Sequence, residues 1–85
     1  MKSVPDNIAR MVVLNHIHPV RAWRDYYHLS KKTLAHLIGM SEYDIEKIES
    51  SNLHLKPAIM KKLISVFHIS PDMIKIRYHN LTHHT

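Results

Sequence analysis

Residues 31–50 of the chain, KKTLAHLIGMSEYDIEKIES, contain the pattern that decides the fold. Ser30 and Ser41 each stand directly before a stretch of helix-forming residues, where a serine oxygen caps a helix by accepting a hydrogen bond from a first-turn amide. Gly39, the only glycine of the chain, lies between the two stretches, and glycine adopts the left-handed backbone that ends a helix at little cost. The pattern therefore predicts two short helices, residues 31–38 and 42–50, with a tight turn at Gly39.

The side chains within this stretch suit two helices that cross at a steep angle. Such a crossing needs a small residue where the helices approach each other, and Ala35 has that place. It also needs apolar residues that bury both helices in one core, and the stretch supplies Leu34, Ile38, Met40, Ile45 and Ile48. Because these positions agree with the caps and the glycine, we interpret residues 31–50 as a helix-turn-helix unit.

The remainder of the chain also predicts helices. Apolar residues recur at spacings of three and four, and prolines stand where helices begin, since a first-turn residue needs no amide donor. These signals predict helices at residues 5–14, 19–27, 57–67 and 71–78, with a polar loop at 51–56. Trp23, Tyr27 and Phe67 are expected in the core, and Tyr26 is expected to be partly exposed. We expect an all-α fold, a compact bundle of five to six short helices.

Length and composition fit one small domain. The chain has 85 residues, no cysteine and a formal net charge of +5 at pH 7, which is compatible with a phosphate-bearing partner. Its longest apolar run, residues 11–14, is far too short to span a membrane, and its first residues lack a secretory signal pattern. We therefore expect a cytoplasmic protein with an N-terminal helical extension (residues 1–18), a helix-turn-helix domain (19–78) and a flexible polar tail (79–85).

The segment 29–49, LSKKTLAHLIGMSEYDIEKIE, resembles the helix-turn-helix of the phage-repressor/Cro (XRE) family, whose usual pattern is LTxxxLAxxxG(V/I)SxxxIxxIE. The similarity extends back through residues 19–24 and forward through 57–67 and 69–74, so that it covers about residues 19–76. The run PVRAWR at 19–24 is also similar to HigA-type antitoxins. The resemblance implies a lambda-repressor-like fold and a sequence-specific transcriptional regulator of the repressor type, which binds double-stranded DNA as a homodimer in a bacterium or phage.

The family pattern implies a role for each residue that matches it. The positions that contact bases correspond to Glu42, Tyr43 and Lys47. Lys31 matches a position that contacts phosphate or a base, and Ser50 and Asn52 match the region that contacts phosphate after the recognition helix. Lys32 is also expected to hold phosphate, because a cation in the first turn of a helix opposes the helix dipole and so favours an anionic partner. Arg24 and Glu49 match a structural ion pair that ties the first helix of the family domain to the end of the recognition helix, and Gly39 matches the turn of the motif.

The predicted recognition helix departs from the family in two ways. The family usually has Glu-x-Gly after this helix, whereas this chain has Glu49-Ser50-Ser51. In addition, four of the seven acids of the chain lie within residues 42–49, and with Lys47 they give this segment a net charge of −3. A helix that enters a groove lined with phosphates is expected to be less acidic.

Three of the four acids have an expected role inside the protein. Asp44 stands three residues after the Ser41 N-cap and resembles the acid of a capping box, and Glu49 is expected to pair with an arginine. Glu42 lies at the helix N-terminus, where the helix dipole favours negative charge, and a glutamate can accept a hydrogen bond from cytosine. Glu46 has no such role, so Glu46→Gln is predicted to strengthen DNA binding at low salt.

A helix-turn-helix also serves as a protein-binding module. The main alternative is therefore an antitoxin-like protein, or a phage-derived or accessory helix-turn-helix protein, whose partner is a toxin or another protein and whose DNA binding is weak or lost. The predicted N-terminal helix, with Ile8, Met11 and Val12, either packs on the domain or forms a dimer or partner surface. The rival dimer patch consists of Met73, Ile74 and Ile76.

No enzyme is expected from this sequence. It has no glycine-rich phosphate loop, no nucleophile elbow and no paired carboxylates on a recognisable cleft scaffold. His79 and His83 are four residues apart, and His16 and His18 lie close in sequence. However, the chain lacks cysteine and the C-terminal pair has no acid nearby, so a complete ligand set is missing. We expect no catalytic residue, no cofactor and no native metal site.

Overall fold

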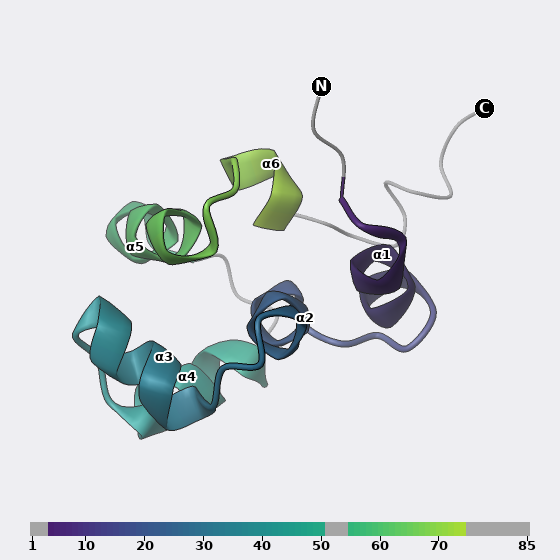
Figure 1. Ribbon diagram of the computed structural model, residues 1–85. Helices are drawn as coiled ribbons and strands as arrows, with labels where there is room; N and C mark the ends of the chain where they lie inside the picture. The colour runs from purple at the N-terminus through teal and green to yellow at the C-terminus, as the bar shows by residue number, and fades with distance from the viewer. Residues whose placement is uncertain (1–3, 51–54, 75–85) are drawn as a thin grey trace.

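A computed structural model describes residues 4–50 and 55–74 of the chain. These residues form helices and no strand, in the order α1 (Asp6–Val13), α2 (Pro19–Tyr26), α3 (Lys31–Ile38), α4 (Glu42–Glu49), α5 (Pro57–Phe67) and α6 (Pro71–Ile74) (Figure 1). The predicted all-α fold class is therefore confirmed. The first five helices begin and end within one residue of their predicted bounds. The predicted end of the last helix near residue 78, and the predicted tail at 79–85, lie outside the described residues.

Buried apolar side chains from all six helices form one core. They are Ile8, Val12, Val20, Ala22, Trp23, Leu34, Ala35, Ile38, Ile45, Leu63, Phe67 and Ile74. Trp23 of α2 is 1% exposed, and its indole N–H donates to the carbonyl oxygen of Met73 at 2.8 Å. Burial of a large apolar side chain stabilises a fold by about 1.5–3 kcal/mol. Trp23 therefore joins α2 to α6 by a hydrogen bond and by packing in the shared core.

Helix α1 packs against α2 as part of this core. Ile8 and Val12 are 0% and 5% exposed, and Met11 packs against the core from its edge. Ile74 is buried as well, and Met73 is partly buried, whereas Ile76 lies outside the described residues. Of the two interpretations of the N-terminal helix, the packing supports the simpler one, because its apolar side chains face the domain. Neither expected dimer patch offers a large exposed apolar surface among its described residues.

Tyr27 lies at the edge of the core and not inside it, so this core prediction was wrong. The side chain is 39% exposed, because α2 ends at Tyr26 and Tyr27 is the C-cap residue. Its ring stacks on that of Phe67 with centroids 5.9 Å apart, and its hydroxyl donates to the carbonyl oxygen of Phe67 at 2.7 Å. Tyr27 therefore supplies a hydrogen-bond donor to the last turn of α5. Its neighbour Tyr26 is 40% exposed, as expected.

Histidines take the place of glycine where several helices end. His16, His28 and His68 have positive φ angles of 54°, 59° and 58°, a conformation that is unfavourable for residues with a Cβ atom. His68 is the C-cap of α5, and its backbone N–H donates to the carbonyl oxygen of Ile64. Near the ends of α1, α2 and α5 the chain thus uses left-handed histidines, which store a small amount of backbone strain.

Candidate nucleic-acid interface

The turn between α3 and α4 has the geometry expected from its glycine. Gly39 lies in the left-handed region with φ 70° and ψ 36°, and the N–H of Met40 donates to the carbonyl oxygen of Ala35 at 2.8 Å. A Cβ atom at Gly39 would meet nothing within 4 Å, so backbone conformation and not space requires glycine here. Ala35 and Ile45 are buried where the two helices pack together. This turn and this contact set the orientation of α4.

Both helices of the unit begin with a serine cap. The Ser30 hydroxyl oxygen accepts from the backbone N–H of Thr33 at 3.0 Å. The Ser41 oxygen accepts from the N–H of Asp44, and the Asp44 carboxylate accepts from the N–H of Ser41, both at 3.1 Å. The capping box predicted for α4 is therefore present. These hydrogen bonds, the backbone one first, lower the pKa of Asp44, so this acid is engaged within its own helix.

Arg24 and Glu49 form a two-pronged ion pair between α2 and the end of α4. The Arg24 Nε donates to one carboxylate oxygen of Glu49 at 2.7 Å, and its Nη2 donates to the other at 3.0 Å. Its Nη1 donates to the carbonyl oxygen of Leu29 at 2.8 Å. The two side chains are 9% and 6% exposed, and the hydrogen bond to Glu49 raises the pKa of Arg24. The structure thus brings together the two residues that the resemblance pairs.

Glu46 has a partner that the sequence did not reveal. Its carboxylate forms an ion pair with the ammonium group of Lys31, at the start of α3. The hydrogen bond from Lys31 lowers the pKa of Glu46. The two residues are fifteen positions apart, and the packing of α3 against α4 brings them together. Helical spacing therefore gives no signal for this pair. The prediction that Glu46 lacks a role inside the protein was wrong.

The outer face of α4 exposes the three residues proposed to contact bases. Tyr43 is 69% exposed, and the Lys47 ammonium lies 5.5 Å from the centroid of its ring, in a cation–π arrangement. Glu42 is also exposed. Among the described residues, Glu42 is the acid of α4 for which neither an ion pair nor a side-chain hydrogen bond is found. Tyr43 and Lys47 are one helical turn apart, so they form one side of a rigidly held helix.

The residues expected to contact phosphate are only partly assembled. Lys32 is exposed in the first turn of α3, whereas Lys31 is engaged by Glu46. Ser50 is the C-cap of α4, and its hydroxyl donates to the carbonyl oxygen of Glu46. Asn52 lies outside the described residues. Lys32 is therefore the one phosphate candidate in the described part of the chain whose charge no carboxylate offsets.

The ion pairs change the charge that α4 presents. Helix α4 has four acids and Lys47, and its acids pair with Arg24 and Lys31. Counted together with these two cations, the helix has a net charge of −1 instead of −3. The acids of α4 therefore repel phosphates less strongly than the sequence of the helix alone indicates, because two of them have cations as direct partners.

His18 has a structural role that the apolar spacing and the serine caps did not predict. Its Nδ1 accepts from the backbone N–H of Val20 at 3.1 Å and so caps α2. Accepting this bond requires an unprotonated Nδ1. Burial lowers the pKa of His18, and the nearby Glu49 carboxylate raises it to a lesser extent. The available signal was the His-Pro pair at residues 18–19, because proline at a first helical position marks the preceding residue as the N-cap.

Comparisons of the chain with protein-family models, characterised proteins and solved structures give no match. Across residues 4–50 and 55–74, no three potential ligands from His, Cys, Asp and Glu gather closely enough to hold a metal ion, and His79 and His83 lie outside these ranges. The longest helix among the described residues, α5, has 11 residues, which is too few to span a membrane. The proposed function therefore depends on the geometry of α3 and α4 and on the family resemblance.

Proposed function

We propose that this chain is a repressor-like transcriptional regulator that binds double-stranded DNA through α3 and α4. The observation that carries the proposal is the exposed face of α4, where Tyr43 and Lys47 project from a helix fixed by Gly39 at one end and Glu49 at the other. A helix held in this way can enter the major groove with its side chains already oriented. Glu42, Tyr43 and Lys47 then contact base edges.

Phosphate contacts come from the start of α3 in this proposal. Lys32 is exposed there and ready to meet a phosphate. Lys31 exchanges Glu46 for a phosphate oxygen when DNA arrives, because an exposed ion pair contributes little in water and is easily replaced. Two copies of the chain, each with α4 in a major groove, occupy half-sites one helical turn apart, about 34 Å, and block access of polymerase to the promoter.

The decisive experiment is selection from a random pool of double-stranded DNA at two salt concentrations. The proposal predicts an enriched palindrome whose affinity falls steeply with salt, since released counterions drive phosphate binding. Lys47→Ala and Tyr43→Ala are expected to weaken binding to the selected site. Arg10→Ala on α1, which also removes one exposed cation, is the matched control and is expected to bind as the parent does. A pool without enrichment would overturn the proposal.

Glu46→Gln tests the exchange of partners at Lys31. The substitution removes the charge that holds the Lys31 ammonium and keeps the size of the side chain. We expect DNA affinity to rise roughly twofold to fivefold at low salt, with a steeper salt dependence, because one more cation is available to phosphate. The binding curves are measured by fluorescence anisotropy. Unchanged or weaker binding would show that Lys31 and Glu46 do not face phosphates.

The engagement of Lys31 by Glu46 also supports a second candidate function. An antitoxin-like or accessory helix-turn-helix protein that binds another protein has no need of a cationic α3 N-terminus, and this ion pair removes one cation from that place. This candidate predicts that the protein co-purifies with a small protein encoded by a neighbouring gene. It also predicts that the protein does not shift DNA in a gel mobility assay, even at low salt. The DNA selection therefore separates the two functions.

A further inference from the structure

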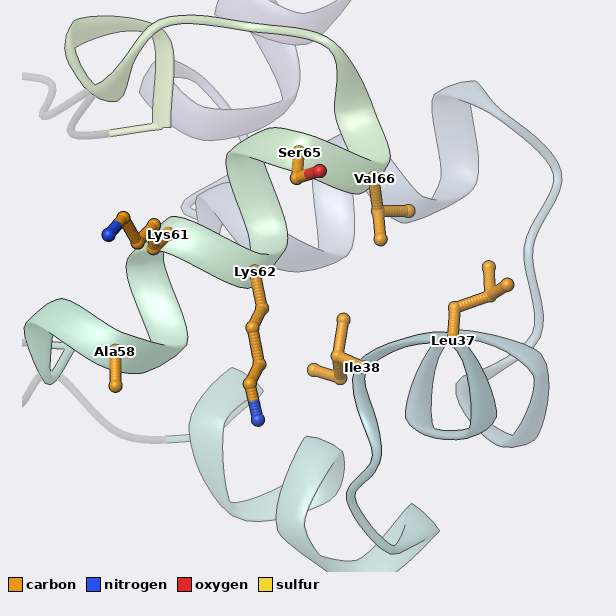
Figure 2. A pocket seen from close by; sticks show the side chains of 7 residues that line it. All are labelled: Leu37, Ile38, Ala58, Lys61, Lys62, Ser65 and Val66. Atoms are coloured by element: carbon orange, nitrogen blue, oxygen red, sulfur yellow. The ribbon is translucent and has the colours of Figure 1, made fainter.

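A groove of about 530 Å³ lies between the last turn of α3 and the outer side of α5. Leu37 and Val66 project from α3 and α5 into the space between the two helices, and Lys62 extends across that space beside Ile38 (Figure 2). Leu37 is 52% exposed, although it is a large aliphatic residue, whereas Ile38 is 3% exposed and closes the floor. The groove therefore exposes apolar surface that the protein does not cover with its own described residues.

The groove is also positive. Lys61 and Lys62 line it from α5, and among the described residues neither ammonium group has a carboxylate within ion-pair distance. The sequence strengthens this polarity, since residues 26–41 and 50–71, which include all of α3 and α5, contain no aspartate or glutamate. An apolar floor beside two unpaired cations is complementary to a segment that carries apolar and acidic side chains together.

We propose that this groove binds an acidic amphipathic helix of another protein. The apolar side chains of that helix pack on Leu37, Ile38 and Val66, and its carboxylates pair with Lys61 and Lys62. Recognition follows the helix-in-groove mode, with anchors at positions i, i+3 or i+4 of the bound segment. A strand-addition mode is not available, because the described part of the chain contains no sheet edge.

The same observations favour a peptide over a nucleic acid at this place. A DNA backbone would use the two lysines but would leave the half-exposed Leu37 and the aliphatic floor without a partner. The groove also lies at the C-terminal end of α3, whereas the phosphate candidates Lys31 and Lys32 stand at its first turn. The inference goes beyond the proposed DNA binding and does not depend on it, because it concerns the other end of α3 together with α5.

The test begins with a displayed library of random peptides of about 16 residues, roughly 24 Å of helix, selected against the full chain. We expect enriched peptides to combine apolar residues at i, i+3 or i+4 with aspartate or glutamate. A synthetic enriched peptide with a fluorescent label then gives Kd by anisotropy. Leu37→Glu is expected to weaken binding by about tenfold or more, because it removes an apolar anchor and adds a repelling charge. Leu14→Glu changes a leucine outside the groove that is 67% exposed, and it is the matched control.

A charge exchange provides a second, independent readout. Lys62→Glu is expected to weaken binding of the acidic peptide, and a peptide with lysine in place of its glutamates is expected to bind the variant better than the parent. Circular dichroism establishes that each variant is folded. If Leu37→Glu does not fold, the charge exchange alone decides the outcome, since Lys62 is exposed.

Several results would overturn the proposal. These are the absence of enriched peptides, enriched peptides without acids, peptide affinity that is the same for the parent and for both groove variants, and self-association of the chain that Leu37→Glu abolishes. The last result would assign the groove to a second copy. If Lys62→Glu abolishes DNA binding and leaves peptide binding unchanged, the groove is assigned to nucleic acid, and the proposal is also overturned.

Discussion

Replacing Arg24 with methionine is the strongest test of how the orientation of α4 is fixed. Methionine keeps most of the length of the side chain but removes every donor. Glu49, which is 6% exposed, then retains a carboxylate with no cation beside it, and the carbonyl oxygen of Leu29 loses the donor that lies 2.8 Å away. Removing one partner of a buried pair costs about 3–5 kcal/mol, a large part of the roughly 5–15 kcal/mol that stabilises a small domain.

The free energy of unfolding is measured by urea denaturation, and the circular dichroism of the helices reports the folded fraction. Arg21→Met on the same helix is the matched control, because Arg21 forms an exposed ion pair with Asp25 at 3.5 Å. We expect this control to change stability by only about 0–1 kcal/mol. The double variant Arg24→Met/Glu49→Met is expected to be more stable than the single variant Arg24→Met, since it leaves no unpaired buried charge.

The outcome that refutes this reasoning is specific. If Arg24→Met costs no more than Arg21→Met, the pair does not hold the end of α4. If the double variant is as unstable as the sum of the two single variants, the cost arises from lost packing and not from an unpaired charge.

Three further predictions concern the caps. The pKa of His18 lies below its ordinary value of 6.5 in the folded chain. As pH drops below about 6.5, the unfolded chain therefore binds the proton first, and the folded state loses stability. His18→Asn keeps a cap that does not titrate in this range, so it should remove part of this loss in denaturation curves measured from about pH 7.5 to about pH 5. Ser41→Ala should cost about 0.5–2 kcal/mol in urea denaturation by removing the cap of α4. His68→Gly should relieve the left-handed strain at the end of α5 and stabilise by up to about 1 kcal/mol, whereas Ser65→Gly, inside the same helix, should destabilise. A thermal scan that ranks these two glycine variants in the opposite order would contradict the strain argument.

Local signals in the sequence were sufficient for the helices and for the serine caps of α3 and α4. Ser41 and Gly39 act on the backbone within a few residues of themselves, so their pattern predicts the end of α3 and the start of α4 without knowledge of the rest of the fold. The apolar spacing similarly predicts which side of each helix is buried. This local information explains why both ends of the first five helices lie within one residue of their predictions.

Contacts between distant residues were not accessible in this way. The pairing of Lys31 with Glu46 depends on how α3 packs against α4, and the exposure of Tyr27 depends on where α2 ends relative to α5. Neither follows from helical spacing, because spacing determines the face of a residue and not the element that lies opposite. The groove between α3 and α5 was missed for the same reason, since Leu37 and Lys62 belong to separate helices.

The two ion pairs of α4 have different consequences because their burial differs. Arg24 and Glu49 are almost completely buried, so a ligand cannot replace either partner without opening the core. Lys31 and Glu46 are 34% and 56% exposed, so water and a phosphate oxygen can both compete for the lysine. The helix can therefore keep its orientation while the charge at its edge changes. In the proposed DNA complex, one buried pair positions the recognition helix, and one exposed pair opens to release the cation that contacts the backbone.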